Sequence, residues 1–507
     1  MTLPQRLLPT SEWPVYERTR LRTLEQTLQS QSTVPLMQLA GHDATRLAMA
    51  IAPHAQNIWI AAGSGNNGGD GLEAALNLHL RGKQVTVSLM GKPDDLPYDA
   101  QRAWQRATNA GVKILQGHLP PELLNGLTPK DLCIDALLGL GASRPITPPM
   151  STWINALNQV SAQRLALDLP SGLNPDSGQP FGFPETAASI VKADHTLTFI
   201  GAKPGLFMGH GRDVCGQIWL ADLRTPEETF AGYMYESPQP DAWLNPHRPS
   251  SPKSHASHKG SCGDVAVVGG EALQQRGMGM TGAALLAAQA ALYAGAGRVM
   301  LSLLGDAGHC HVPHDLMQRA WAQLQLEKLC VVAGCGGGQA VQSVMSELLL
   351  RSAHLVLDAD GLNAVASHSE LQQQLQQRAA KSQATVITPH PLEAARLLRS
   401  TTAQVQNNRL EAAKELAARY QCTVVLKGSG TIIMAPQHKP RINTSGDGKL
   451  AIGGTGDVLA GLIGAQMARG LTAFEAACQS VQLHGQAASE WPVNLSLTAS
   501  RLARRMH

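Results

Sequence analysis

Two series of short apolar runs, each run followed by a helical pattern, restrict the folds open to this chain of 507 residues. Runs that alternate with helical patterns are typical of a parallel sheet wrapped by helices. The sequence therefore predicts two α/β units. The first series comprises residues 57–62, 84–90, 131–137, 164–169 and 195–200. The second comprises residues 264–270, 330–333, 354–357, 385–388 and 422–427, with an alanine-rich helix expected at 281–294.

A stretch without sustained periodicity separates the two series. Residues 236–260 carry five prolines and three histidines, a composition typical of a linker and the entry to a second domain. A chain of 507 residues is too long to fold around a single ordinary hydrophobic core. We therefore expect domains at 1–235 and 256–507, joined by a linker at 236–255. The halves show no self-similarity in register, which favours a fusion of different units over a duplication.

Composition and charge exclude several classes of function. The formal net charge is +3 and no dense run of lysine and arginine occurs, so nucleic acid is not an expected partner. The start lacks the apolar core of a signal peptide, and no run of about 18 apolar residues follows. These features predict a cytoplasmic protein that does not enter a membrane. The eight cysteines lack short metal-ligand spacings, so we expect reduced thiols.

The glycine-rich turn GSGNNGGDGL, residues 63–72, follows the first apolar run and opens a helix. Backbone N–H groups at such a helix start attract phosphate, and glycine lets the chain approach the anion closely. Glycines alone fit a simple tight turn equally well. Asn66, Asn67 and Asp70 exceed what helix capping requires, and they could contact sugar hydroxyls or bind a cation.

Two more loops with polar residues follow runs of the first series. They are IDALLGLGASRP at residues 134–145 and ALDLPSGLNPDSG at 166–178. Asp135 and Asp168 each end an apolar run, and either one alone would fit a turn or helix cap. Because ligands of open α/β sheets bind outside the carboxyl ends of strands, we expect the three loops to converge on one crevice.

The most specific stretch of the second half is KLAIGGTGDVLAGLIGAQMARG, residues 449–470. The small residues GGTG lead into an apolar helix with Asp457 in its first turn, which combines an anion-binding helix start with a carboxylate. In phosphoryl transfer an aspartate can accept the proton of the attacking hydroxyl while backbone groups stabilise charge. A favourable first-turn charge would explain Asp457 but not the small residues before it.

A glycine turn with a lysine lies upstream, in VVLKGSGTIIM at residues 424–434. Lys427 and the turn after it could cradle a nucleotide phosphate, although a hairpin with an exposed lysine has the same pattern. The residue order of a Walker A loop is absent. The turn consists of Gly428, Ser429, Gly430 and Thr431.

Other polar residues follow runs of the second series. His390 lies between two prolines and fits a buried turn as well as a ligand site. Asp358, Asp360 and Asn363 fit the binding of phosphate or magnesium, or a helix cap. We expect a magnesium ion in this half of the chain.

The first half resembles the N-terminal epimerase domain of bifunctional NAD(P)H-hydrate repair enzymes. The resemblance rests on LMQLAG at residues 36–41, GNNGGDG, DALLGLG, LDLPSGL and FIGAKPGL at 199–206, and it spans most of residues 10–225. It implies a Rossmann-like doubly wound sheet and the substrates NADHX and NADPHX. Asp168 would be catalytic, as the candidate for proton transfer, and Asn67, Asp135 and Ser171 would hold a potassium ion. The implied substrate-binding residues are Asn66, Asn67, Gly68, Gly69, Asp70, Gly139, Leu140, Gly141, Ala142, Ser143, Arg144, Pro145 and Asp168.

One residue departs from this family's pattern. Gln38 stands in the L-M-E-x-A-G stretch where many relatives carry an acid. The departure puts only a role for that position in doubt.

The second half resembles ribokinase-like folds and, more narrowly, the ADP-dependent dehydratase domain of the same enzymes. The matching stretches are HKGSCGDVAVVGG at residues 258–270, GMTGAALLAAQAALYAGAGRV at 279–299, LDADGLNAV at 357–365 and TPHPLEAARLL at 388–398. AGCGGG at 333–338 departs from the G-P-G-L-G of relatives. The resemblance implies that ADP or AMP binds Lys427, Gly428, Ser429, Gly430, Thr431 and Gly456. It also implies that the hydrated coenzyme binds Ala283, Gly336, Gly338, His390 and the catalytic Asp457.

Together the halves predict metabolite repair. The first would interconvert the R and S forms of hydrated NADH or NADPH, and the second would dehydrate the S form at the expense of ADP, giving AMP and phosphate. One alternative is a hydroxyl kinase for a vitamin precursor, because related folds share the GTGD element. Another is a first half that only binds a dinucleotide or a protein and regulates the second. We also expect the chain to form a homo-oligomer.

Overall fold

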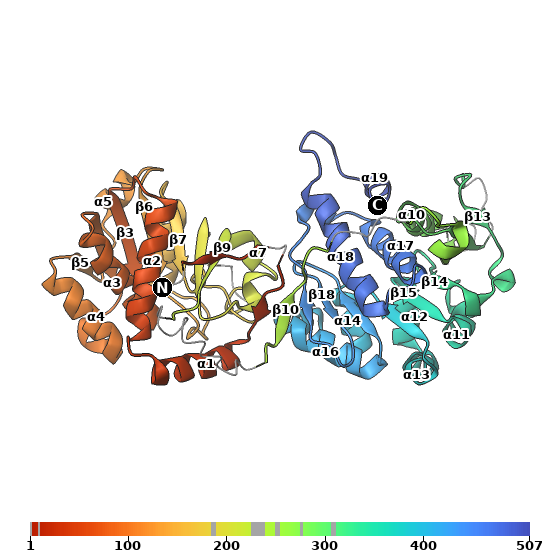
Figure 1. Ribbon diagram of the computed structural model, residues 1–507, viewed down its shortest axis with the longest axis horizontal. Coiled ribbons are helices and arrows are strands. Elements are labelled where there is room, and N and C mark those ends of the chain that lie inside the picture. The colour runs from red at the N-terminus through yellow and green to blue at the C-terminus, as the bar shows by residue number, and fades with distance from the viewer. Residues whose placement is uncertain are drawn as a thin grey trace. The chain divides into compact units, whose positions relative to one another are not determined.

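The computed structural model describes residues 3–8, 11–183, 189–224, 239–248, 254–273, 277–305 and 311–506. The chain divides into two compact units, Met1–Leu8 with Trp13–Ala242 and Pro9–Glu12 with Trp243–His507 (Figure 1). The break between Ala242 and Trp243 falls inside the stretch predicted as a linker. Each unit has its own sheet and its own buried core. None of the described helices is long and apolar enough to cross a membrane.

The first unit contains a doubly wound sheet with the strand order β1-β9-β8-β7-β6-β3-β4-β5. Neighbouring strands are parallel, except that β1 is antiparallel to β9. The chain enters the parallel part at β3, runs through β4 to the edge strand β5, and returns to β6 on the other side of β3. The loops that follow β3 and β6 therefore lead away in opposite directions. The strands are β1 Gln5–Arg6, β3 Asn57–Ala62, β4 Gln84–Leu89, β5 Lys113–Gln116, β6 Leu132–Ala136, β7 Gln163–Leu167, β8 His195–Phe199 and β9 Gln217–Ala221. A further two-residue strand is β2 Pro14–Val15.

Helices cover both faces of this sheet. Ile58 and Ile60 of β3 belong to a core with α2, α3 and α4, whereas Trp59 and Ala61 belong to a core with α6. Burial on both sides explains why the strands read as continuous apolar runs rather than as an alternating pattern. The helices are α1 Arg18–Gln31, α2 Leu36–Ile51, α3 Asn66–His79, α4 Tyr98–Asn109, α5 Pro121–Gly126, α6 Met150–Gln159 and α7 Gly211–Val214.

The second unit contains a mixed sheet in which β13-β12-β11-β14-β15-β16-β17-β18-β19-β10 are neighbours in that order. The strands from β13 to β17 are parallel, whereas β17, β18 and β19 form antiparallel pairs. The strands are β10 Ala242–Leu244, β11 Asp264–Glu271, β12 Arg298–Leu304, β13 Met317–Gln318, β14 Cys330–Ala333, β15 His354–Leu357, β16 Ala384–Ile387, β17 Thr423–Leu426, β18 Ile432–Met434 and β19 Arg441–Ile442.

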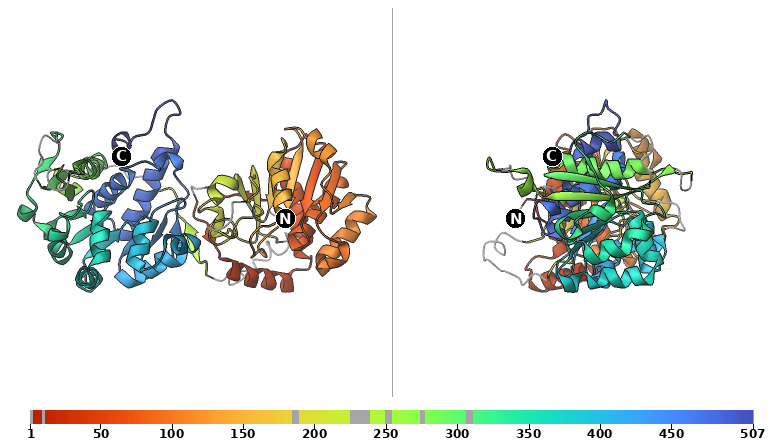
Figure 2. Two further views of the ribbon diagram at one scale, coloured as in Figure 1. Left: turned by 180° about the vertical axis from the view of Figure 1, so that it is seen from behind. Right: turned by 90° about the vertical axis from the view of Figure 1, so that its right-hand side faces the viewer.

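Helices lie on both sides of the second sheet (Figure 2). Residues of α10, α17, α18 and α19 share one core with the sheet, and α11 to α16 complete the unit. The helices are α10 Thr281–Tyr293, α11 Gln342–Arg351, α12 Asp360–Ser367, α13 Ser369–Gln377, α14 Pro391–Leu398, α15 Thr402–Asn407, α16 Arg409–Tyr420, α17 Thr455–Ala468, α18 Ala473–Ser489 and α19 Ala499–Ala503.

Helix α17 is the central helix of the second unit. It contacts β11, β14 and β15 as well as α10, α18 and α19, and most of its residues are buried. A Cβ atom on Gly461 would lie 2.0 Å from the carbonyl oxygen of Ala287 in α10. A Cβ atom on Gly464 would lie 2.4 Å from Val332 in β14. The small residues of α17 therefore allow it to pack closely against α10 and the sheet.

The predicted α/β fold class is confirmed in both halves. The runs predicted at 57–62, 330–333 and 354–357 coincide with β3, β14 and β15, and the other predicted strands differ by one or two residues at one or both ends. The prediction of an irregular linker needs one correction, because residues 242–244 form β10, which pairs with β19. Three residues are too few for a pattern of period two to be recognised.

Candidate active sites

The first candidate site lies at the start of α3, where β3 and β6 diverge. A Cβ atom on Gly68 would lie 1.9 Å from the Gly63 carbonyl oxygen, and one on Gly69 would lie 2.5 Å from Met37 Sδ. Gly68 is therefore required for the chain to fold back on itself, and Gly69 leaves room for the Met37 side chain of α2. This packing accounts for them without a ligand.

A cavity of about 690 Å³ opens at this point and brings the three predicted loops together. Leu21 and Glu25 of α1 and Met37 of α2 complete its wall, whereas Gly68 and Gly69 are buried and do not line it. The predicted residues that line the cavity are Asn66, Asn67, Asp70, Gly139, Leu140, Gly141, Ala142, Ser143, Arg144, Pro145 and Asp168.

Asp168 is held in a strained backbone conformation at the end of β7. Its φ angle is 68°, in the left-handed region that residues other than glycine rarely adopt. Its N–H donates to the Leu197 carbonyl at 2.7 Å, and its Oδ2 accepts from the Leu140 N–H at 2.8 Å. Lys203 Nζ lies 2.7 Å from Oδ1. These contacts fix the direction of the carboxylate.

Lys203 is a residue that the sequence patterns do not single out. Its side chain is 2 % exposed, and besides Asp168 its ammonium donates to Thr198 Oγ1 at 2.7 Å and to the Phe199 carbonyl at 3.3 Å. It also lines the cavity. A lysine inside the apolar loop FIGAKPGL is the signal that could have indicated it, because a buried ammonium needs a partner.

Asp135 and Ser171 form a second, fully buried pair near the cavity. Ser171 Oγ donates to Asp135 Oδ1 at 2.6 Å, and the Ser171 N–H donates to Oδ2 at 2.8 Å. Burial raises the pKa of Asp135 to about 6, although these hydrogen bonds act in the opposite direction. The pair explains why Asp135 is tolerated inside the sheet.

Asn67 offers an oxygen that fits a bound cation. Its Nδ2 donates to the Leu167 carbonyl at 3.3 Å, and its Oδ1 is buried without a hydrogen-bond partner. A buried acceptor without a partner indicates an ion or water that satisfies it. Asn67, Asp135 and Ser171 all supply oxygen atoms, which are the ligands that hard cations prefer.

Asp70 faces the same cavity from α3. No hydrogen bond or ion pair joins its carboxyl to any of the residues that the structure describes. Burial raises its pKa well above the usual range, and the nearby Asp168, Glu25 and Glu73 carboxylates add to the shift. Asp70 and Asp168 therefore occupy unlike surroundings within one cavity.

The second candidate site lies at the start of α17. Gly454 has a φ angle of 93°, and a Cβ atom there would lie 2.6 Å from Leu286. Thr455 Oγ1 donates to the Leu450 carbonyl at 2.9 Å, and His484 Nε2 donates to the Thr455 carbonyl at 3.0 Å. These contacts hold the GGTG loop and leave Asp457 in the first turn of the helix.

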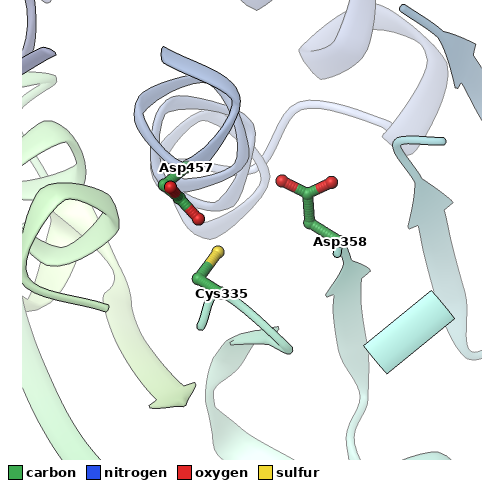
Figure 3. Close-up of side chains that lie close together, drawn as sticks. All are labelled: Cys335, Asp358 and Asp457. Carbon is green, nitrogen blue, oxygen red and sulfur yellow. The ribbon is translucent and has the colours of Figure 1, made fainter. Parts of the chain in front are cut away.

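Asp457, Asp358 and Cys335 lie together at this helix start (Figure 3). One ligand atom from each lies within 4.8 Å of the others, a spacing that would suit a metal ion. Lys427 Nζ is 2.6 Å from Asp358 Oδ1, however, so an ammonium already balances the charge of the Asp358 carboxylate. We therefore interpret the group as an acid cluster with its own cation.

Burial raises the pKa of Asp457 to about 6, and the neighbouring Asp358 carboxylate adds to this shift. A hydrogen bond with Cys335 and the charge of Lys427 act to lower it. Burial also raises the pKa of the Cys335 thiol well above its usual range, so the thiol stays protonated and donates to the carboxylate. The sequence patterns do not indicate this contact.

The turn after Lys427 connects β17 to β18 as a hairpin, but its lysine is not exposed. The Lys427 side chain is 19 % exposed. Burial acts to lower its pKa, but the Asp358 and Glu393 carboxylates outweigh burial and raise it. A Cβ atom on Gly456 would lie 3.3 Å from Lys427 Nζ, so the turn and the start of α17 meet. The alternative of an exposed lysine is therefore wrong.

A buried arginine shapes the same turn. Arg409 is 2 % exposed and donates to the carbonyls of Leu426 and Gly430 at 3.2 and 3.3 Å. Gly428 and Gly430 have φ angles of 129° and 70°, and Thr431 Oγ1 donates to the Gly428 carbonyl at 3.0 Å. The backbone of the turn is thus fixed before any nucleotide binds.

His390 is the N-cap of α14. Its Nδ1 accepts from the Leu392 N–H at 3.1 Å, and Glu393 Oε2 accepts from the His390 N–H at 2.8 Å. Burial, and then the charge of Lys427, lower the pKa of His390. Its side chain is 45 % exposed, so the alternative of a buried turn histidine is wrong. The neutral ring remains accessible beside Glu393.

The remaining predicted residues lie in tightly packed loops. A Cβ atom on Gly336 would lie 2.8 Å from Ala283 Cβ, and one on Gly338 would lie 2.1 Å from Glu271 Oε2. Gly336 is therefore next to Ala283, as a shared substrate surface would require. Packing alone excludes larger side chains at both glycines.

The acids predicted to bind phosphate or magnesium already have protein partners. Asp358 pairs with Lys427, and Asp360 Oδ2 accepts from the Gly338 N–H at 2.8 Å. Asn363 Oδ1 accepts from Arg396 at 2.6 Å. These contacts favour a structural role for Asp360 and Asn363.

Comparison with known proteins identifies the family. Residues 33–205 match the family described as YjeF-related protein N-terminus, and residues 266–506 match NAD(P)H-hydrate dehydratase. The bifunctional NAD(P)H-hydrate repair enzyme Nnr of Escherichia coli (strain K12) is 34% identical over 472 residues, with 89% of this chain and 84% of the relative covered. The chain belongs to the bifunctional NAD(P)H-hydrate repair enzymes. The Nnr enzyme of Coxiella burnetii is 33% identical over 490 residues, and the aligned region covers 94% of each of the two chains.

Membership in this repair-enzyme family assigns a reaction to each unit. The first carries the epimerase and the second carries the NAD(P)H-hydrate dehydratase, so the alternative of a hydroxyl kinase is not favoured. A solved structure titled ADP/ATP-dependent NAD(P)H-hydrate dehydratase from Bacillus subtilis, co-crystallized with ATP/Mg2+, is 28% identical. The superposed region covers 50% of this chain and 91% of the Bacillus subtilis chain, with a TM-score of 0.43.

Proposed function

We propose that the repair enzyme dehydrates the S form of hydrated NADH or NADPH at the expense of ADP, with Asp457 as catalytic base. The observation that carries this proposal is the position of Asp457 in the first turn of α17, beside the Lys427–Asp358 pair. The helix start supplies N–H groups for a phosphoryl group, and the carboxylate can accept a proton there.

In this mechanism the C6 hydroxyl oxygen attacks the terminal phosphoryl group of ADP while Asp457 takes the hydroxyl proton. AMP leaves, and the GGTG amides stabilise the charge on the transferred group. The nitrogen lone pair of the ring then forms a C6=N bond as phosphate leaves C6. Loss of a proton from C5 to the departing phosphate forms the C5=C6 bond, returns the electron pair to nitrogen and restores the dihydronicotinamide. What begins as a kinase step thus ends as a dehydration.

Binding roles in the second unit follow the same geometry. We propose that Lys427, Gly456 and the turn 428–431 hold ADP or AMP, and that Ala283, Gly336, Gly338 and His390 contact the hydrated coenzyme. Magnesium would accompany the nucleotide and neutralise phosphate charge. Because Asp358, Asp360 and Asn363 have protein partners, they contribute no free ligand pair for it.

In the first unit we propose that residues 66–70 and 139–145 hold the hydrated dinucleotide, with Asp168 at the reacting carbon. Asn67, Asp135 and Ser171 would hold potassium, which supplies a fixed positive charge. The unpartnered Asn67 oxygen supports this assignment. A cytoplasmic location and a homo-oligomeric assembly stay predictions.

Replacement of Asp457 tests the dehydratase assignment. With the S hydrate and ADP, we expect Asp457→Asn to lower kcat by about 10²–10⁴-fold, the usual contribution of a general base. Interconversion of the hydrates without nucleotide should not change. Asp447→Asn is the matched control, because Asp447 is an exposed carboxylate of the same loop that pairs with Lys449.

Near wild-type dehydration by Asp457→Asn would contradict the assignment. The products test the reaction type, because a dehydratase releases inorganic phosphate together with the absorbing reduced coenzyme. A stable phosphomonoester would indicate a kinase instead.

A further inference from the structure

Two of the four carboxyl groups that line the epimerase cavity, Asp70 and Asp168, have opposite surroundings. Asp168 accepts from the Leu140 N–H and pairs with Lys203, so both of its oxygens face donors. Asp70 lines the same cavity, and the described residues give its carboxyl no such partner. A carboxyl group between ammonium and N–H donors favours the anion, whereas one without donors favours the protonated acid.

Lys203 has little freedom to act on a substrate itself. Its ammonium lies within hydrogen-bond distance of Asp168, Thr198 and the carbonyls of Phe199 and Gly201. An ammonium saturated in this way holds its neighbours in place and cannot easily release a proton. Lys203 therefore acts through Asp168.

We propose that Asp70 carries the proton during epimerisation, and that Lys203 is a positioning residue that keeps Asp168 as a fixed anion beside the reacting ring. The proposal rests on the epimerase function of the first unit. It assigns to Asp168 the stabilisation of positive charge rather than the transfer of a proton.

The charges around Asp70 support its role as an acid. Burial and the Asp168 carboxylate raise its pKa well above the usual range. A carboxyl group with a raised pKa can stay protonated close to neutral pH and donate to a leaving hydroxyl. The other charged groups around Asp70 and its cavity are Glu73 of α3, Glu25 and Arg22 of α1, Asp99 of α4, and Arg144 and Lys203 of the loops.

Asp70 gives its proton to the C6 hydroxyl oxygen while the C6–O bond breaks and its electron pair leaves with water. The lone pair of the ring nitrogen forms a C6=N bond, and the resulting cation lies beside the Asp168 carboxylate. Water then adds to the opposite face of C6, the C6=N pair returns to nitrogen, and the proton of the added water returns to Asp70.

The test follows interconversion of the R and S hydrates by the full chain without nucleotide, so that the dehydratase is silent. We expect Asp70→Asn to lower kcat by about 10²–10⁴-fold with little change in KM, because an amide cannot transfer the proton. Asp70→Glu should restore part of the rate. Lys203→Met should lower kcat, and Lys203→Arg should recover most of it, because arginine keeps the charge.

Lys83→Met is the matched control. Lys83 is also buried, but it donates only to the carbonyls of Pro53 and Ala55, away from the cavity. Loss of this lysine should leave epimerisation within about twofold of wild type once folded protein is compared, since it touches no reacting group. An equal loss in Lys83→Met and Lys203→Met would overturn the positioning role.

The pH profile decides which carboxyl carries the proton. Wild-type kcat should fall as the pH rises and Asp70 ionises. Asp168→Asn should keep this basic limb at a lower rate and move it to lower pH, because the Asp168 charge raises the pKa of Asp70. The residual rate of Asp70→Asn should lack the limb.

Two further results would separate a failure of the Asp70 assignment from a failure of the epimerase function. A basic limb that disappears in Asp168→Asn and persists in Asp70→Asn would overturn the assignment. A wild-type chain that does not interconvert the hydrates would instead contradict the epimerase function itself.

Discussion

Each unit places a lysine–aspartate pair beside an aspartate that has no ion-pair partner among the described residues. Lys203 pairs with Asp168 near Asp70, and Lys427 pairs with Asp358 near Asp457. In both sites the pKa of the unpaired acid is raised, chiefly by burial and then by the paired carboxylate. The carboxylate of each pair thus raises the pKa of the unpaired acid beside it. The unpaired acid is therefore the better candidate for proton transfer.

The pH dependence of dehydration should report Asp457. A catalytic base must be ionised, and its pKa is raised to about 6, so kcat should fall as the pH drops through about 6 and be constant above it. Cys335→Ala should move this limb to higher pH, because the hydrogen bond from Cys335 acts to lower that pKa.

Cys330→Ala controls for the loss of a buried thiol. Cys330 is also buried, but it is not among the groups that shift the pKa of Asp457. The measurement is kcat against pH with saturating S hydrate and ADP. Equal limbs in wild type and Cys335→Ala would show that the thiol does not tune the base.

Single residues show the limit of prediction from sequence. The patterns select Asp70, Asp168, Lys427 and Asp457, because polar residues at strand ends of a parallel sheet are conspicuous. The lysine that pairs with Asp168 lies 35 positions later, and the thiol that touches Asp457 lies more than a hundred positions earlier. Such partners follow from three-dimensional packing, which no local pattern carries.

At the scale of elements, the close contact between α17 and α10 gives a stability prediction. Gly461→Ala should lower the free energy of unfolding by about 1–3 kcal/mol, because the new methyl group meets the Ala287 backbone and α17 must shift. Dehydration should fall with it, since α17 carries Asp457.

Gly282→Ala is the matched control for a helical glycine. Position 282 lies in α10, and outside the helix's own backbone no atom lies within 4 Å of the place that an added methyl group would take. Alanine there should be neutral or stabilise by up to about 1 kcal/mol. Denaturation by urea measures both variants. Equal unfolding free energies for the two would show that α17 and α10 tolerate a wider separation.

Elements buried on two faces were predictable, whereas short and edge elements were not. Every residue of β14 is buried, and the predicted limits of this strand coincide with the structure. β5 and β10 have four and three residues, and β5 lies at the edge of its sheet with its ends exposed. Their apolar residues are too few to form a run, so only pairing with a neighbouring strand defines them.

At the scale of the whole chain, the described residues of each candidate site lie within one unit. The lining of the epimerase cavity comes from residues 21–223, and the acid cluster of the dehydratase from residues 335–457. The described residues thus give the two candidate sites no residue in common, and we expect the S hydrate to link the two reactions.

This separation predicts complementation between two impaired chains. Given mixed hydrates and ADP, Asp168→Asn should convert the S fraction rapidly and the R fraction only at its lowered rate of epimerisation, and Asp457→Asn should form reduced coenzyme only slowly. An equimolar mixture of the two proteins should convert both forms, because the S hydrate made on one chain can diffuse to the other. Absorbance of the reduced coenzyme follows the reaction, with wild type at half the total concentration as the control. A mixture that converts the R fraction no faster than Asp168→Asn alone would show that the hydrate passes between sites only within one chain.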